Sequence, residues 1–399
     1  MIKKYSELSN AINDFKNFKD SNDPAYITHY FQNNNFEFKN LLAKKNKEDL
    51  LSELFPNYKN FEIIWDIPFV PSKKGNFTFI DLFAGIGGFR IAFQDLGGKC
   101  VFGCEWDINA KKTYEKNFGE IPFGNIREIN EKDIPNHDIL LAGFPCQAFS
   151  IAGRKGGFED IRGTLFFDLA RIIKEKQPKA FFLENVKGLL SHDKGRTIKT
   201  ILTILREDLK YFVPNPEIIN AKYFGVPQNR ERIFIVGFRS DLNINTFTYP
   251  KPGKVDKTIK DIMEEKTVSS KYYLSLQYLQ TLRNHKIRHE LKGNGFGLEI
   301  IDIEGIANAI VVGGMGRERN LVIDNRLKDY KPVTNIKGQI NKEGIRRMTP
   351  REWARLQGFP DKFIIPVSDT QAYKQFGNSV AIPAIKATGA NIINILFKE

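Results

Sequence analysis

A cysteine stands directly behind a proline in "LAGFPCQAFS", where Cys146 follows an apolar segment and precedes a polar, glycine-rich stretch. A free thiol has a pKa of about 8.5, so a nucleophilic cysteine needs a neighbouring positive charge or a helix N-terminus. Arg230 and Arg232 of "QNRERIF" alternate onto one face entering another apolar segment and could supply this charge. His137 stands at the opposite end of the segment before Cys146, which argues against a histidine base. Position alone leaves a buried, unreactive cysteine equally open.

Glu184 and Asn185 end a further apolar segment, in "FFLENVKGLL". A carboxyl at such a place is partly removed from water, which raises its pKa and favours the protonated form. A thiolate, a neutral acid and an anchoring positive charge together suit a reaction in which an electron-poor aromatic ring accepts a nucleophile. The sequence therefore predicts nucleophilic catalysis by Cys146 with Glu184 as the acid.

A glycine-rich loop in "FIDLFAGIGGFR" places Gly85, Gly87 and Gly88 between an apolar segment and a helical one. Glycine lets the backbone approach a ligand closely and leaves N–H groups free, which is typical of sites for nucleotide-like ligands. Arg90 occupies the place of the third glycine in the dinucleotide pattern, which argues against a dinucleotide. A tight turn without a ligand is the alternative for this loop taken alone.

Glu105 lies 20 residues beyond Gly85, in "CEWDINA" after the second apolar segment. A carboxylate there can accept hydrogen bonds from both hydroxyls of a ribose, and Trp106 beside it offers a flat face to adenine. These two residues predict a site for a ribose and a purine. An exposed glutamate at the start of a helix is the alternative.

Five short apolar runs must position these residues: "FTFIDLF", "KCVFGCE", "HDILLAGF", "KAFFLENV" and "RIFIVGF". Helical spacing separates them, and "GTLFFDLARIIKEKQ" places five apolar side chains on one face: Leu165, Phe166, Leu169, Ile172 and Ile173. This alternation predicts an α/β fold with a mostly parallel sheet covered on both faces, whose ligands bind beyond the carboxyl ends of the strands. The alternation fails from about residue 240 to 345, which predicts an inserted module, and residues 1–75 predict a separate small helical extension.

The chain of 399 residues has a formal charge of +13, which favours a polyanionic partner. Residues 240–347 carry 19 basic against 13 acidic residues, so nearly half of the excess lies there, although a solvated lysine-rich surface explains it equally. No run of about 18 apolar residues occurs, so we expect a cytoplasmic chain without signal peptide or membrane span. Cys100 and Cys104 alternate within an apolar run, which indicates buried strand residues rather than a metal site.

The chain contains eight motifs in order: "DLFAGIGG", "EW", "GFPCQAFS", "RGTLFF", "LENV", "QNRER", "RRMTPREWARLQGFP" and "YKQFGNSV". This set resembles the DNA (cytosine-5)-methyltransferases of bacterial type II restriction–modification systems over roughly residues 76–399. The resemblance implies a doubly wound, Rossmann-like fold of an S-adenosylmethionine-dependent methyltransferase. It leaves the N-terminal extension, 1–75, outside and implies three parts: a catalytic and cofactor-binding domain, 76–240; a smaller target-recognition domain, 241–345; and a return to the catalytic domain, 346–399.

Carried over by residue, the resemblance implies that Cys146 adds to carbon 6 of cytosine while Glu184 holds ring nitrogen 3 and the exocyclic amine. Carbon 5 then attacks the methyl group of S-adenosylmethionine, and Arg232 holds the cytosine carbonyl. The residues implied to brace this pocket are Arg230, Gln228 and Asn185. The residues implied to line the cofactor site are Phe83, Gly85, Ile86, Gly88, Glu105, Trp106, Asn125, Ile126, Pro145, Leu165, Asn378 and Ser379.

One departure from the family pattern is "GNI", which puts Asn125 where an aspartate usually accepts from the adenine amine. An asparagine carbonyl can accept the same bond.

The implied partner is duplex DNA with a short specific target, whose cytosine must be flipped out of the helix. The loop "SIAGRKGGFEDIRG" resembles a lid that closes over that base, and Arg317 and Arg319 are candidates for guanine, phosphate or solvent contacts.

The resemblance further implies a monomer without a metal or a membrane, and a cognate restriction endonuclease as a genetic partner.

Three alternatives stay open at this point. An RNA (tRNA) cytosine-5 methyltransferase would keep nearly every motif, but the basic inserted module argues for duplex DNA. A NAD-dependent oxidoreductase explains the glycine loop and Glu105 but not Cys146, Glu184 and the arginines together. A non-catalytic DNA-binding relative is disfavoured because every catalytic position is intact.

Overall fold

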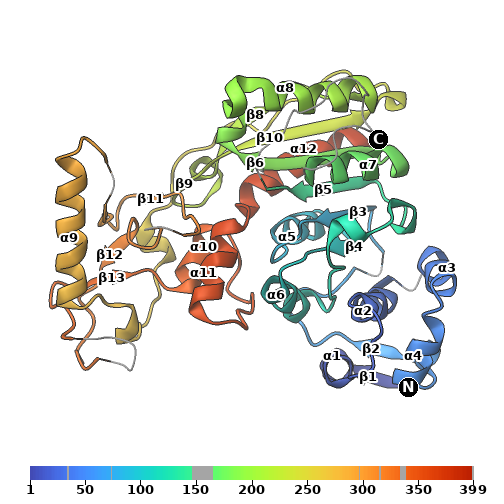
Figure 1. Ribbon diagram of the computed structural model, residues 1–399, viewed down its shortest axis with the longest axis horizontal. Helices are drawn as coiled ribbons and strands as arrows, with labels where there is room; N and C mark the ends of the chain where they lie inside the picture. Colours follow the sequence, from blue (N-terminus) through green and yellow to red (C-terminus); the bar gives the residue numbers. More distant parts are fainter. Residues whose placement is uncertain are drawn as a thin grey trace.

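A seven-stranded sheet forms the centre of the protein (Figure 1). The computed structural model describes residues 1–33, 36–72, 74–145, 165–295, 297–313, 316–332 and 338–397. The strand order is β4-β3-β5-β6-β10-β7, with β8 paired to β10; the first four strands of this order are parallel, and β10 is antiparallel to its neighbours. The strands are β3 Phe77–Leu82, β4 Gly98–Cys104, β5 Ile139–Gly143, β6 Ala180–Val186, β7 Tyr211–Phe212, β8 Glu217–Asn220 and β10 Glu231–Arg239.

Both faces of this sheet are buried. Along β5, Ile139 and Leu141 enter one hydrophobic core, and Leu140 and Ala142 enter the other. Because successive side chains of a strand point to opposite faces, an uninterrupted apolar run is what a sheet covered on both sides requires. The five predicted strands and the doubly wound, mostly parallel α/β fold are therefore confirmed.

Helices cover the two faces (Figure 1). The first core contains side chains of α5, α6 and α12, and the second contains those of α7 and α8. The predicted apolar face of α7 is confirmed, since Phe166, Leu169, Ile172 and Ile173 are buried while Leu165 is half-buried. The helices are α5 Gly88–Asp95, α6 Ile108–Phe118, α7 Leu165–Lys176, α8 Arg196–Thr203, α10 Pro350–Leu356, α11 Asp369–Asn378 and α12 Ile382–Phe397.

The direction of β10 decides where its first residues lie. Because β10 is antiparallel to β6, its N-terminal end stands at the carboxyl edge of the parallel strands. The register pairs Arg232 with Val186 and Phe234 with Glu184. The arginines that precede and begin β10 therefore share an edge with the ends of β5 and β6.

A smaller body lies between β10 and α10 in sequence, at the left of Figure 1. It contains α9 Leu276–Glu290 at its outer side and the antiparallel pair β12 Leu321–Ile323 and β13 Ile345–Arg347. Two small apolar clusters of its own stabilise it, one of them around Leu279 and Leu321. The parallel pair of β9 Gln228–Asn229 and β11 Ala307–Asn308 connects it to the central sheet region.

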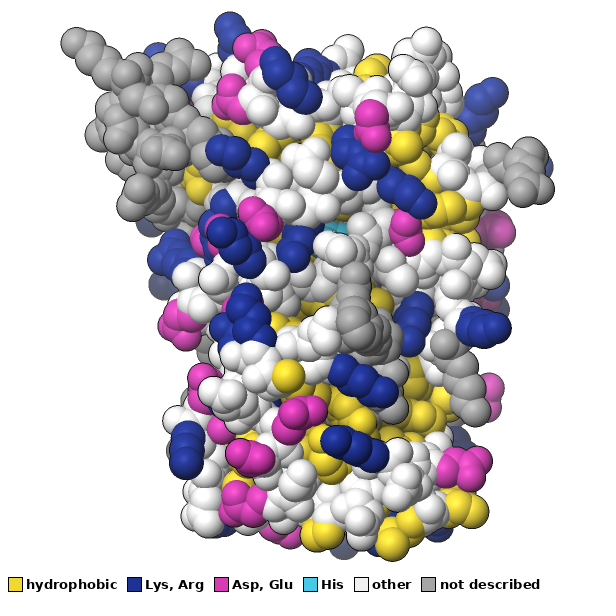
Figure 2. Space-filling model, turned by 90° about the vertical axis from the view of Figure 1, so that its right-hand side faces the viewer, with side chains coloured by type: hydrophobic (Ala, Val, Ile, Leu, Met, Phe, Trp, Pro, Cys, Tyr) yellow, Lys and Arg dark blue, Asp and Glu magenta, His cyan; other side chains and the backbone are white. Residues whose placement is uncertain are grey.

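The N-terminal segment forms four helices around a separate apolar cluster. Its elements are β1 Ile2–Lys4, α1 Tyr5–Asp14, α2 Asp23–Asn33, α3 Phe36–Lys44, α4 Glu48–Leu54 and β2 Glu62–Ile64, with β1 parallel to β2. Figure 2 shows the side of the molecule on which this segment lies, where Lys and Arg side chains are interspersed with Asp and Glu rather than gathered in one stripe. Among the residues that the structure describes, this face therefore shows charges of both signs and no single basic stripe.

One described segment, Asp369–Phe397, is long and apolar enough to span a membrane by composition alone. It consists of two helices, α11 and α12, which are interrupted at Ser379–Ala381. In α12, Ile385 and Ile392 are fully buried in the first core, and the helix packs against α5. We interpret it as a core element of the α/β domain.

Cys100 and Cys104 both lie in β4 and are buried, as the sequence predicted. Burial raises the pKa of both thiols far above the ordinary value, so neither is a thiolate near neutral pH. Among the described residues no cluster of His, Cys, Asp and Glu could hold a metal ion.

Candidate active site

The predicted nucleophile follows the end of β5. Pro145, the residue before Cys146, is exposed two residues beyond the end of that strand. Cys146 itself and the predicted lid, residues 150–163, lie outside the described residues. His137 precedes β5 at the opposite edge of the sheet, where it is buried, and burial lowers its pKa to about 4. His137 is therefore at the wrong edge to act as a base for Cys146.

Glu184 lies at the carboxyl edge of the sheet, on β6 and beside Gly143 of β5. Its Oε1 is 3.2 Å from Nε of Arg232, the second residue of β10. Only 8% of Glu184 is exposed, and burial raises the pKa of its carboxyl against the opposing charges of Arg232 and Arg230. A carboxyl that retains a proton more readily than a free glutamate thus stands beside a guanidinium group, close to the end of the strand that leads to Cys146.

Asn185 is buried next to Glu184 and bonds the chain that leads to the predicted nucleophile. Its Nδ2 donates to the carbonyl of Phe144 at 2.8 Å, and its Oδ1 accepts from the N–H of Val186 at 2.8 Å. Asn185 therefore fixes the residue before Pro145 relative to the end of β6.

Gln228 and Arg230 connect three parts of the chain below this edge. The Nε2 of Gln228 donates to the carbonyl of Leu356 at 2.8 Å, and its Oε1 accepts from the N–H of Ile310 at 3.0 Å. Arg230 donates to the carbonyls of Ile310 at 2.9 Å and Ser379 at 2.6 Å. Burial and then the charge of Arg232 lower the pKa of Arg230 to about 9. The side chains of Gln228 and Arg230 are therefore bonded to backbone groups of other segments, and they fix these segments next to the carboxyl edge of the sheet.

The glycine loop connects β3 to α5. Phe83, Gly85 and Gly87 all have positive φ angles, 54°, 55° and 85°. At Gly87 a Cβ atom would lie 2.2 Å from the ring of Phe118, so only glycine fits there. At Gly85 a Cβ atom would have no neighbour within 4 Å, which leaves open space beside the backbone. The loop is thus closely packed on one side and open on the other.

Glu105 connects this loop to the end of β4. Its Oε2 accepts from the N–H of Gly85 at 2.8 Å, and its Oε1 accepts from the N–H of Asp107 at 2.7 Å. Burial raises the pKa of Glu105, while the backbone bonds act in the opposite direction. The adjacent Trp106 is 81% exposed, so its ring is available to a ligand. The structure therefore brings together Gly85, Glu105 and Trp106.

The remaining residues predicted for the cofactor site lie in other places. Asn125 is half-exposed and its Oδ1 accepts from the N–H of Arg127 at 3.2 Å. Ser379 lies against Gly88, where a Cβ atom would be 3.1 Å from its Oγ. Four more are placed as follows: Asn378 is exposed at the end of α11, Leu165 is half-buried at the start of α7, Ile86 is buried in the first core, and Ile126 is buried in the second.

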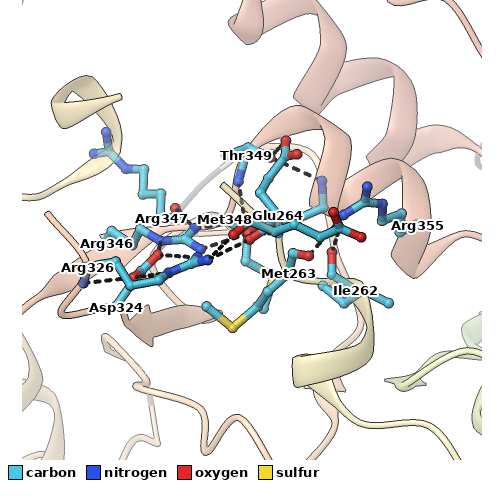
Figure 3. A network of polar contacts seen from close by, with 12 residues as sticks. Ile262, Met263, Glu264, Asp324, Arg326, Arg346, Arg347, Met348, Thr349 and Arg355 are labelled. Atoms are coloured by element: carbon cyan, nitrogen blue, oxygen red, sulfur yellow. Dashed lines mark hydrogen bonds and ion pairs between the residues drawn. The ribbon is translucent and has the colours of Figure 1, made fainter. Parts of the chain in front are cut away.

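A buried ionic network joins the inserted body to α10 (Figure 3). Arg346 is fully buried; its Nε is 2.9 Å from Oδ2 of Asp324, and its Nη2 is 2.7 Å from Oε1 of Glu352. Glu352 also accepts from the N–H groups of Glu264 at 3.0 Å and Thr349 at 2.7 Å. Sequence reasoning missed this network. The only local signal was the Thr349–Glu352 spacing, a capping box that begins α10.

Replacing Arg346 with methionine should lower the free energy of unfolding by about 3–5 kcal/mol, because Glu352 would remain buried without this positive charge and Asp324 would keep only its pairing with Arg326. Burial alone would raise the pKa of Asp324, but hydrogen bonds from Arg326 and the charge of Arg346 lower it to about 2. The network therefore stabilises the fold above the ordinary aspartate pKa and loses this contribution as the pH falls toward 2.

Urea unfolding of Arg346→Met measures this effect. The matched control is Arg283→Met, which breaks the exposed pair of Arg283 and Glu343 and should cost less than about 1 kcal/mol. Equal losses in the two variants would contradict the assignment of Arg346 as the link between the inserted body and α10.

Comparison with known proteins places this arrangement in a family. A family model described as C-5 cytosine-specific DNA methylase matches residues 77–394. Type II methyltransferase M.HpaII of Haemophilus parainfluenzae is 67% identical over 351 residues, 88% of this chain and 97% of that protein. M.HhaI of Haemophilus parahaemolyticus is 42% identical over 322 residues, 79% of this chain and 93% of its own length.

A solved structure of a more distant protein agrees in fold. The S. pombe Dnmt2 methyltransferase superposes with a TM-score of 0.60 at 17% identity and covers 80% of this chain and 99% of its own. The relatives do not favour the RNA methyltransferase or the NAD-dependent oxidoreductase. The chain belongs to the C-5 cytosine-specific DNA methylases, as a type II DNA (cytosine-5) methyltransferase of the restriction–modification kind.

Proposed function

We propose that the protein methylates carbon 5 of a flipped cytosine through a covalent bond from Cys146, with Glu184 as the acid. The observation that carries this assignment is the buried pair of Glu184 and Arg232 at the carboxyl edge of the sheet, beside the end of β5. A proton-holding carboxyl and a guanidinium suit the polar edge of a cytosine ring, since the acid can donate to ring nitrogen 3 and the guanidinium to the carbonyl oxygen.

In this mechanism the thiolate of Cys146 forms a bond to carbon 6 while the carboxyl of Glu184 gives its proton to nitrogen 3. The electron pair of the ring then resides at carbon 5, which becomes nucleophilic and accepts the methyl group. A base removes the proton from carbon 5, the bond between sulfur and carbon 6 breaks, and nitrogen 3 returns its proton to Glu184. Arg232 neutralises charge on the carbonyl oxygen throughout.

S-adenosylmethionine, when bound, would supply an electrophilic methyl group, and the electron pair of the broken bond between sulfur and methyl would stay with the departing neutral thioether. The residues beside the glycine loop fit this ligand, because Gly85 has open space around it and the ring of Trp106 is exposed. Each oxygen of Glu105 accepts one backbone bond and keeps a further acceptor site for a ribose hydroxyl. The other assigned residues are Phe83, Ile86, Gly88, Asn125, Ile126, Pro145, Leu165, Asn378 and Ser379.

Duplex DNA is the substrate of the family, and we assign target recognition to residues 241–345, between catalytic parts 76–240 and 346–399. Arg317 and Arg319 both lie within this segment. Arg319 pairs with Glu299 at 3.3 Å, and Arg317 lies over the ring of Tyr373 on α11, 5.5 Å from its centroid. We further infer a monomer that acts in the bacterial cytoplasm and protects DNA from a cognate restriction endonuclease.

Bisulfite sequencing of DNA from cells that express the protein tests the function, since it reports both the modified base and its sequence context. The expected result is 5-methylcytosine within one short target. Moving residues 241–345 into an active relative of different specificity should transfer that target. An active chimera that keeps the relative's own target would contradict the domain assignment, and unmodified cytosine in the first experiment would contradict the function.

A further inference from the structure

A short stretch between α6 and Asn125 pairs with the end of β4. The N–H of Phe123 donates to the carbonyl of Gly103 at 2.8 Å, and the N–H of Glu105 donates to the carbonyl of Phe123 at 2.8 Å. Phe123 thus forms a single parallel bridge to Cys104 at the end of β4, the outermost strand of this edge, and residues 121–124 run beside it. Their position sets the separation of Glu105 and Asn125, the two residues assigned above to the ribose and the adenine.

Two side chains of the N-terminal segment hold this stretch from outside. The Oγ1 of Thr28, fully buried in α2, accepts from the N–H of Ile121 at 3.0 Å. The Oδ1 of Asn22, directly before α2, accepts from the N–H of Gly124 at 2.8 Å. Backbone donors at the edge of a sheet need such partners, and here side chains take the place of a further strand.

Aromatic contacts add to these bonds. The ring of Phe123 contacts the rings of His29 and Tyr26 of α2, with centroid distances of 4.7 Å and 4.9 Å. The Nδ1 of His29 bonds the carbonyl of Ala25 at 2.8 Å, so in the neutral ring its Nε2 accepts from the N–H of Gly103 at 3.2 Å; the same Nε2 lies 3.3 Å from Oε1 of Glu120. Burial lowers the pKa of His29, which favours the neutral ring that this pairing requires.

The same segment also holds the helix behind the glycine loop. Arg90, the residue at the place of a third glycine, is 1% exposed. Its Nη2 donates to Oε1 of Gln32 in α2 at 2.7 Å, and its Nη1 lies 2.9 Å from Oε1 of Glu120. The α2 region therefore contacts two of the chain segments that adjoin the cofactor site, although the family match begins only at residue 77.

We propose that α2 and the residue before it form a positioning element of the cofactor site, in which Asn22 and Thr28 are positioning residues. They fix residues 121–124 against β4 and so place Asn125 relative to Glu105. The proposal rests on the cofactor site assigned under the proposed function. It gives the N-terminal segment, for which the sequence predicted no role, a part in binding S-adenosylmethionine.

Isothermal titration with S-adenosylmethionine tests this role in the full-length protein. Thr28→Val and Asn22→Ala each remove one acceptor, and we expect each to raise the Kd about fivefold, the effect of one hydrogen bond. At saturating cofactor their kcat should change by less than about twofold. Thr28→Ser and Asn22→Asp keep the acceptor oxygen and should bind normally. Thr197→Val is the matched control, because it removes a buried hydroxyl of α8 that contacts His192 at 2.7 Å.

Normal affinity in both Thr28→Val and Asn22→Ala, with only a lower melting temperature, would mean that the segment merely stabilises the fold. Equal weakening by Thr28→Ser would likewise overturn the hydrogen-bond argument. Glu105→Ala separates the two levels of inference. If it binds normally, the proposed cofactor site is wrong; if it binds weakly while the α2 variants bind normally, only the positioning role is wrong.

Discussion

Replacing Cys146 with serine is expected to abolish methylation, with a loss of more than about 10³-fold in kcat. A hydroxyl without a strong base is a far weaker nucleophile than a thiolate. His137, buried at the opposite edge of the sheet, cannot supply that base. Transfer of a tritiated methyl group to duplex DNA measures the loss.

The covalent bond itself can be trapped. Release of Cys146 requires departure of the proton on carbon 5, so a target with fluorine at that carbon should leave a protein–DNA adduct that survives denaturation. Cys146→Ser should form no adduct. Cys100→Ala is the matched control, because burial keeps that thiol protonated and its loss should leave trapping intact. Near-normal turnover of Cys146→Ser, or methylation of the exocyclic nitrogen, would contradict the mechanism at its first step.

The central fold could be predicted from the sequence because its signal is local. Each parallel strand is buried on both faces, so a run such as residues 139–144 is apolar throughout and directly follows the polar pair His137 and Asp138. The carboxyl-edge placement of Glu184 and of the residue before Cys146 follows directly from these runs. Apolar character does not encode strand direction, however, so the antiparallel course of β10, which brings Arg232 to Glu184, became visible only in the structure.

Contacts between distant segments could not be predicted. The bond of Thr28 to Ile121 joins residues 93 positions apart, and no periodicity in either segment marks it. The pairing of Arg346 with Asp324 depends in the same way on how the inserted body folds. The cofactor site falls between these cases: the glycine loop and Glu105 have local signatures, whereas the packing of Gly88 against Ser379 depends on the return of the chain through α11.

Glu184 is the residue where sequence and geometry together predict the sharpest pH dependence. Burial raises the pKa of its carboxyl, so the protonated, proton-donating form persists to higher pH than in a free glutamate and is lost as the pH rises through that raised value. The rate of single-turnover methyl transfer should therefore fall as the pH rises through that value. This falling part of the pH–rate profile is the limb assigned to Glu184. The same proton stabilises the folded state at low pH, and its contribution to the free energy of unfolding disappears over the same range.

Glu184→Gln should slow methyl transfer by about 10²–10⁴-fold, the usual contribution of a positioned acid, because an amide cannot give a proton to ring nitrogen 3. The variant should also lose the pH limb assigned to Glu184, whereas Glu217→Gln, an exposed change on β8, which pairs with β10, should keep both rate and limb. A glutamine variant that retains the parent's pH limb would mean that another group donates the proton. A variant slowed at every pH, with unchanged affinity for S-adenosylmethionine, would instead locate the loss at the cytosine, where the pair of Glu184 and Arg232 stands.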